Sequence, residues 1–157
     1  MKPEGFLRRR IIDPVLTLLK QGVTPEKIAL SLAFGIAIGV LPVLGSGTLL
    51  CTVAAILLRL NLPAMQAANW ISYPLQLALL IPFFRWGEIA FAAPHVPLTP
   101  SQLVGMFQAD FWGSIRALWD TTLRGIAVWA VAAAAFIPLC YFLMKPILTR
   151  IPFRSPS

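Results

Sequence analysis

Residues 125–144 read GIAVWAVAAAAFIPLCYFLM and contain no charged side chain. A helix of about 20 apolar residues is long enough to cross the hydrocarbon core of a bilayer. Three bases and no acid follow this stretch, at Lys145, Arg150 and Arg154. Because basic residues concentrate on the cytoplasmic side of membrane helices, the pattern predicts a last span whose C-terminal end faces the cytoplasm.

The composition of the whole chain is also typical of a membrane protein. Apolar residues make up 58% of its 157 residues and charged residues 12%, against about 45–50% and about 25% in soluble domains. Residues 28–84 carry a single charge, on Arg59. A soluble chain of this size could not bury so much apolar surface. We therefore predict an all-α integral membrane protein with about four membrane-embedded helices, plus amphipathic helices at the interface.

The formal net charge of +7 raises nucleic-acid binding as an alternative. The bases gather near the chain ends, however, and no nucleic-acid-binding motif is present. Residues 1–23 predict a basic amphipathic segment on the cytoplasmic surface, and residues 148–157 predict a basic cytoplasmic tail. The expected partners are the lipid bilayer, with anionic headgroups at both basic termini, and further copies of the chain in a homo-oligomer.

No pattern of catalytic or metal-binding residues stands out. Cys51 and Cys140 both lie in apolar runs, which favours two buried thiols over a disulfide. His95 is the only histidine, and no metal-ligand spacing occurs. No nucleophile is paired with a base. The sequence therefore predicts a protein that is not an enzyme and that needs no metal and no cofactor.

Residues 24–147 are expected to form one helical membrane domain. A straight helix over residues 28–58 would be about 46 Å long, too long for a core of about 30 Å, so we predict a broken hairpin there. Two alternatives stay open, namely two short spans or a re-entrant hairpin with its tip inside protein. The later elements are a third membrane segment over residues 66–91, an outer amphipathic helix over 100–124 and the last span over 125–145.

The turn of the hairpin is the first candidate site, with Pro42, Gly45, Gly47 and Thr48. In the functional interpretation, Gly47 and Thr48 open a helix inside the membrane. The free backbone N–H groups and the positive end of the helix dipole then face a phosphate or carboxylate, as in transporters with broken helices. The alternative is an ordinary hairpin turn, because glycine alone makes turns.

The second candidate is a polar face in the segment over residues 66–91. Asn69, Tyr73 and Gln76 share one side of a helix, followed by Arg85 and Glu88. Polar faces in lipid turn inward, so these residues predict either a substrate path or hydrogen bonds between helices. Arg85 and Glu88 are three residues apart and can pair at the membrane interface.

Four ordered motifs carry a resemblance to a known family. They are GVTPEKIA at residues 22–29, GIAIGVLP at 35–42, LNLP at 60–63 and NWISYP at 69–74. The chain resembles the bacterial family named domain of unknown function 2062 (DUF2062) over roughly residues 20–145. The resemblance implies a small bacterial inner-membrane protein, and it implies no activity and no catalytic residue.

Two functions remain open. The chain is either a small membrane protein that transports or handles a lipid or an anionic small molecule, or a scaffold that organises other membrane proteins. The first uses the broken hairpin and the polar face. The second uses the outer amphipathic helix and the GxxxG pattern of Gly35 and Gly39, which lets another helix approach closely, within the chain or between chains. The intramembrane turn and the polar face favour the first, with both termini in the cytoplasm of a multi-pass protein.

Overall fold

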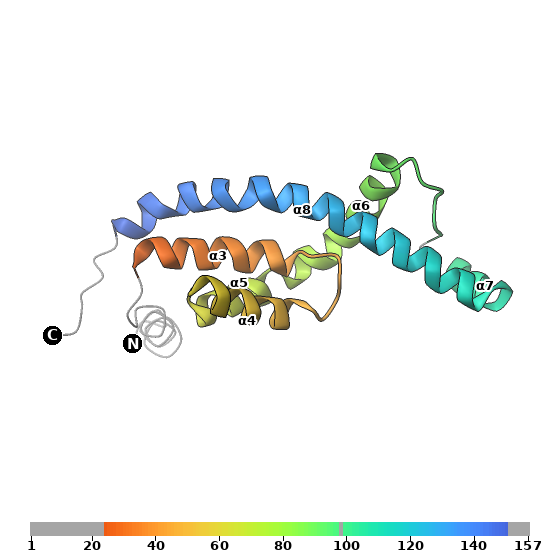
Figure 1. The fold of residues 1–157 in the computed structure, drawn as a ribbon, viewed down its shortest axis with the longest axis horizontal. Helices are drawn as coiled ribbons and strands as arrows, with labels where there is room; N and C mark the ends of the chain where they lie inside the picture. The colour runs from red at the N-terminus through yellow and green to blue at the C-terminus, as the bar shows by residue number, and fades with distance from the viewer. Residues whose placement is uncertain (1–23, 98, 151–157) are drawn as a thin grey trace, which may run out of the picture.

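The computed structural model describes residues 24–97 and 99–150, and the regular elements within them are all helices. The segment predicted at residues 1–23 and most of the tail predicted at 148–157 lie outside these residues. The described helices (Figure 1) are α3 (Pro25–Gly39), α4 (Gly47–Leu58), α5 (Leu62–Ile71), α6 (Tyr73–Ala90), α7 (Pro100–Ala109) and α8 (Phe111–Thr149).

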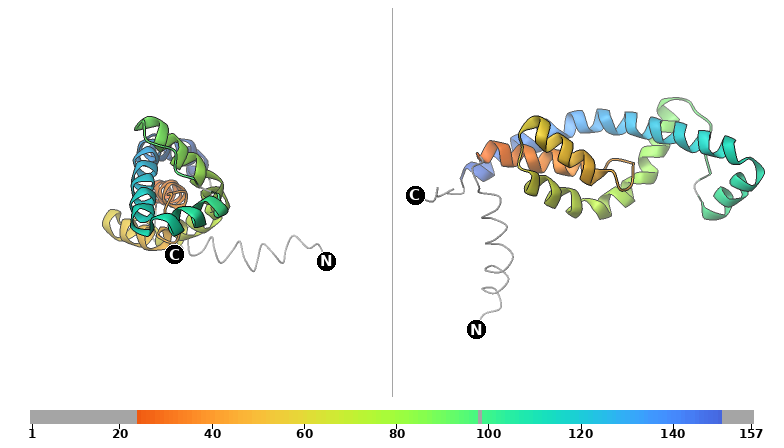
Figure 2. Two further views of the ribbon diagram at one scale, coloured as in Figure 1. Left: turned by 90° about the vertical axis from the view of Figure 1, so that its right-hand side faces the viewer. Right: turned by 60° about the horizontal axis from the view of Figure 1, so that its bottom comes forward.

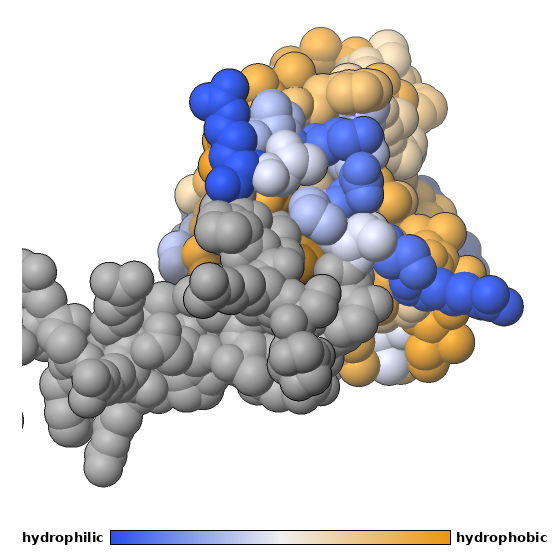
Figure 3. All heavy atoms as spheres, turned by 90° about the vertical axis from the view of Figure 1, so that its left-hand side faces the viewer, coloured by the Kyte–Doolittle hydropathy of each residue, from blue (hydrophilic) through white to orange (hydrophobic). Residues whose placement is uncertain are grey.

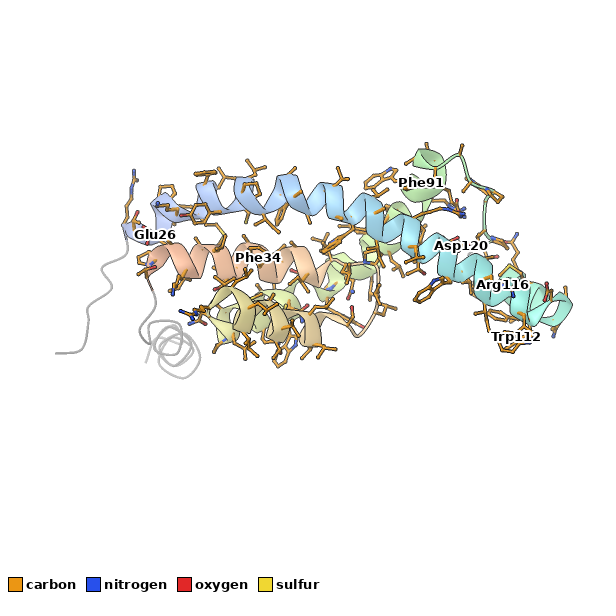
Figure 4. The ribbon with its side chains drawn as sticks, in the orientation of Figure 1. Glu26, Phe34, Phe91, Trp112, Arg116 and Asp120 are labelled. Atoms are coloured by element: carbon orange, nitrogen blue, oxygen red, sulfur yellow. The ribbon has the colours of Figure 1, made fainter. Side chains whose placement is uncertain are left out.

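The helices α3 and α8 lie side by side and run antiparallel (Figures 1 and 2). At one end, Lys145 Nζ lies 3.6 Å from Glu26 Oε1, and Figure 4 shows Glu26 beside the end of α8. Further along, Trp129 Nε1 donates a hydrogen bond to the Ala37 carbonyl, at 2.7 Å. The helix α3 therefore begins at the level where the apolar stretch 125–144 ends.

The glycines of the GxxxG pattern pack against α5 within the same chain. A Cβ atom added to Gly35 would lie 2.5 Å from the Met65 carbonyl oxygen, and one added to Gly39 would lie 2.8 Å from Ser72 Cβ. Only glycine permits such a close approach of two helices. The hairpin of α3 and α4 and the helix α5 share a small core, made of Ile38, Cys51, Ala55 and Met65.

The predicted third segment is two helices rather than one. The axes of α5 and α6 differ by 64° at a break between them, and Ser72 is the single residue that joins them. Pro74 explains the break, because it has no N–H to donate to the Trp70 carbonyl and its ring clashes with that group.

The boundary predicted at residue 125 is also wrong. The helix α7 ends at Ala109, and Asp110 caps the next helix by accepting a hydrogen bond from the Gly113 N–H, at 3.0 Å. The helix α8 then continues for 39 residues through Gly125 without a break. Its length is about 58 Å at 1.5 Å per residue. The outer amphipathic part and the last span therefore belong to one helix.

The outer surface of the molecule is largely apolar. The most apolar part of α8 is only 6% buried, and Val131 on α8 and Leu57 on α4 are each 75% exposed. Figure 3 views the end where α3 begins and α8 ends, and there hydrophilic residues gather with hydrophobic ones bordering them. A soluble protein would bury such side chains, whereas lipid can surround them.

Length and composition allow fewer crossings than we predicted. Among the described helices, α8 alone is long and apolar enough to cross a membrane, and α5 with α6 passes the same test only as a bent pair. The helix α4 is apolar, but its 12 residues are too few to cross. Four membrane-embedded helices thus stay a prediction.

Candidate functional site

The turn between α3 and α4 leaves the first N–H groups of α4 without a side-chain cap. Gly45 has φ +82°, a left-handed conformation that favours glycine. The Ser46 hydroxyl donates to the Val43 carbonyl at 2.8 Å, so it does not cap α4. Pro42 is fully buried beneath this turn. The start of α4 therefore keeps the positive end of its dipole open to a ligand.

The polar side chains of the α5–α6 break reach this turn. Gln76 Nε2, which is buried, donates to the carbonyls of Leu41 at 2.7 Å and Val43 at 3.4 Å. Asn69 lies against Gly47, where an added Cβ would come within 3.2 Å of Asn69 Cγ and still closer to its Oδ1. Gly47 is thus needed to make room for the Asn69 amide.

A pocket of about 180 Å³ opens where the turn meets the break. Six of the nine sequence-predicted residues line it together with Trp70: Gly45, Gly47, Thr48, Asn69, Tyr73 and Gln76. Two candidates that the sequence treated separately therefore form one site. Trp70 was missed, although its spacing of three residues from Tyr73 puts both on the same side of a helix.

The pocket is lined by several residues with polar side chains but by no charged one. These residues are Thr48, Asn69, Trp70, Tyr73 and Gln76. Asn69 is 8% exposed, and its amide makes no side-chain hydrogen bond to another described residue. The Asn69 amide atoms stay accessible from the pocket, so they can form hydrogen bonds with a polar ligand or with water there.

Arg85 and Glu88 lie elsewhere and have a different role. The predicted pair is confirmed, with Arg85 Nη1 2.7 Å from Glu88 Oε2. Glu88 is 1% exposed and also accepts a hydrogen bond from the Val96 N–H at 3.0 Å. His95 Nδ1 lies 3.0 Å from the same carboxylate, although its side chain is 71% exposed. Arg85 and Glu88 thus fasten the loop after α6 and do not line the pocket.

These features define a class of protein: a chain whose described elements are all helices, with an apolar exterior, a helix long enough to cross a membrane and an open pocket lined by polar side chains. The chain matches, over residues 8–155, the family model described as "Uncharacterized protein conserved in bacteria (DUF2062)", and it belongs to that family. The resemblance seen in the sequence motifs is thereby confirmed. No curated protein and no solved structure matches the chain.

Proposed function

We propose that this chain is a multi-pass protein of the bacterial inner membrane that binds a lipid headgroup or an anionic small molecule in the pocket at the start of α4. It would act in the transport or handling of that molecule, without catalysis. The observation that carries the proposal is the convergence of an uncapped helix start with the side chains of Asn69, Tyr73 and Gln76. Helix N-termini bind anions because their N–H groups and dipole favour negative charge.

The membrane setting is supported by the exposed apolar side chains of α4 and α8. The antiparallel pairing of α3 and α8 supports an orientation with both ends on one side, since Glu26 and Lys145 meet there. The excess of bases near both chain ends supports the proposal that this side faces the cytoplasm. The pocket lies near the other end of α3, away from the end where Glu26 and Lys145 meet.

The scaffold alternative has less support. It relied on the outer amphipathic helix and on a glycine face that is free to receive a helix from another protein. That face is instead occupied by α5, which leaves no room for a Cβ at Gly35 or Gly39. Replacing Gly39 with leucine would therefore unfold the hairpin rather than separate two proteins.

Mass spectrometry of lipids and small anions that remain with the gently purified protein tests the proposal. The Asn69→Asp variant keeps the shape of the side chain and adds a negative charge, so it should release a bound anion. Gln108→Glu on α7 is the matched control, because it adds the same charge at an exposed residue outside the pocket. An identical set of retained molecules in wild type and folded Asn69→Asp protein would contradict the proposal.

A further inference from the structure

A second cavity is lined by other residues of the same helix α4. It is an apolar groove of about 370 Å³ between α3, α4 and α8, and its lining includes Phe34, Leu50, Ala54, Leu57 and Trp129. Leu57 is among the most exposed side chains of the molecule. The groove therefore opens on the apolar exterior, where lipid would surround the protein.

The helix α4 contributes lining residues to both cavities. Gly47 and Thr48 line the polar pocket, and Leu50, Ala54 and Leu57 line the groove. Leu50 comes only three residues after Gly47, or about 4.5 Å along the helix, and Leu57 lies about 10 Å further. One molecule that fills both cavities must have a polar end joined to an apolar chain.

The electrostatics of the pocket restrict the charge that the polar end of the ligand can carry. A helix N-terminus contributes the equivalent of about half a positive charge, and no charged side chain lines the pocket. This suits a group with one negative charge, such as a phosphodiester. A phosphate monoester with two charges would be left largely uncompensated, which is costly away from water.

We propose that the ligand is a glycerophospholipid with its phosphodiester in the polar pocket and one acyl chain in the apolar groove. The inference rests on the proposed function and names the ligand class of that same site. The Asn69 amide and the N–H groups of Gly47 and Thr48 bind the phosphodiester, and Leu50, Ala54 and Leu57 contact the chain.

Native mass spectrometry of the full chain in detergent tests this inference with two probes. Dioleoyl phosphatidylglycerol has the headgroup and the chains, and glycerol 3-phosphate has a phosphate without chains. Asn69→Asp changes the pocket, and Ala54→Phe fills the groove. Ala135→Phe makes the same change at an exposed residue of α8 that does not line the groove. If Asn69→Asp loses its helical circular dichroism, Thr48→Val replaces it as the pocket variant. If Ala54→Phe does, Leu57→Trp replaces it as the groove variant. Both substitutes are at exposed residues.

We expect the pocket variant and the groove variant each to lower lipid retention at least about tenfold, with Ala135→Phe like wild type and glycerol 3-phosphate not retained. Unchanged lipid retention in the folded groove variant, or retention of glycerol 3-phosphate that depends on Asn69, overturns the phospholipid assignment and leaves the proposed function standing. If Asn69→Asp and wild type retain both the lipid and glycerol 3-phosphate to the same extent, the inference and the proposed function are both overturned.

Discussion

Glu88 carries a charge at one of the most buried positions of the described chain. A buried carboxylate is tolerated when cations and N–H groups surround it, and Glu88 has the Arg85 guanidinium and the Val96 N–H. The Val96 side chain is itself buried, and the Arg85 guanidinium also donates to the Val96 carbonyl at 3.3 Å. These contacts tie the loop after α6 to the end of that helix.

Replacing Glu88 with glutamine should lower the free energy of unfolding by about 1–3 kcal/mol, because the Arg85 cation then lacks its anionic partner. Thermal unfolding in detergent measures the loss, and limited proteolysis should show faster cleavage within residues 91–97. His95→Ala is the control, with an expected change within about 0.5 kcal/mol, because that side chain is mostly exposed. Equal stability of Glu88→Gln and wild type would mean that the loop is held by other contacts.

Two glycines of the hairpin turn should respond differently to alanine. A Cβ on Gly47 meets the Asn69 amide, whereas one on Gly45 meets no atom within 4 Å but sits at a left-handed φ. We expect Gly47→Ala to displace Asn69 and to reduce ligand retention. Gly45→Ala should cost about 1 kcal/mol of stability and keep the ligand. Unfolding curves and retained-ligand mass spectrometry separate the two effects, and loss of ligand in both variants would argue against a specific role for Asn69.

At the scale of elements, the bend between α5 and α6 builds the site. Asn69 lies before the break and Gln76 after it, and both line the pocket. In a continuous helix, α6 would extend straight from α5, and the Gln76 side chain would no longer reach the Leu41 carbonyl. The bend thus brings Gln76 into contact with Leu41, although the two residues are distant in the sequence.

Replacing Pro74 with alanine restores the N–H group and should straighten the pair. Spin labels at residues 67 and 89, in a variant without cysteines, report the change by pulsed electron paramagnetic resonance. We expect the distance to lengthen toward roughly 33 Å, the rise of 22 residues in a straight helix. Pro82→Ala is the matched control, because Pro82 lies inside α6 and produces no break there. An unchanged distance in Pro74→Ala would assign the bend to packing instead.

The sequence predicted some of these elements better than others. The hairpin and its turn followed from helix length, which is a local property, and the structure has them. The break at Ser72 was missed, because Pro74 and Pro82 look alike in an apolar run although only one of them ends a helix. The start of α8 was also missed, because we predicted one amphipathic helix over residues 100–124, whereas Asp110 ends α7 and caps α8 within that range.

The sequence predicted most residues of the candidate site, but it did not predict that they line one pocket. Glycines in an apolar run and amides at helical spacing are visible in a single sequence. The hydrogen bond from Gln76 to Leu41 joins residues 35 positions apart, and no local pattern encodes such a contact. For the same reason Arg85 and Glu88 were grouped with Gln76 because they follow it in the same segment, although they fasten a different loop.

At the scale of the whole molecule, the hairpin helices are short for a bilayer. The 15 residues of α3 and the 12 of α4 give lengths of about 22 Å and 18 Å, against a core of about 30 Å. Of the two alternatives for this hairpin, these lengths favour the re-entrant one. The turn and its pocket would then lie below the outer surface.

Cysteine labelling with a membrane-impermeant maleimide tests this topology. Single cysteines replace Lys27 near the start of α3, Gln102 on α7 and Leu44 in the turn, all exposed residues. We expect Lys27→Cys to react from the cytoplasm, Gln102→Cys to react from the periplasm and Leu44→Cys to react from neither side. Rapid periplasmic labelling of Leu44→Cys would show two full spans instead, and labelling of residues 27 and 102 from the same side would contradict the whole arrangement.

The continuity of α8 has a mechanical consequence. The 14 residues from Phe111 to Arg124 extend the same helix beyond the apolar stretch, which makes an arm of about 21 Å. Figure 4 shows Trp112, Arg116 and Asp120 along this arm, with α7 at its far end. A membrane helix tilts when the bilayer thins, and a tilt of about 10° would swing the tip of the arm by about 4 Å. In the proposed membrane setting, α8 would therefore convert a change in bilayer thickness into a displacement of α7.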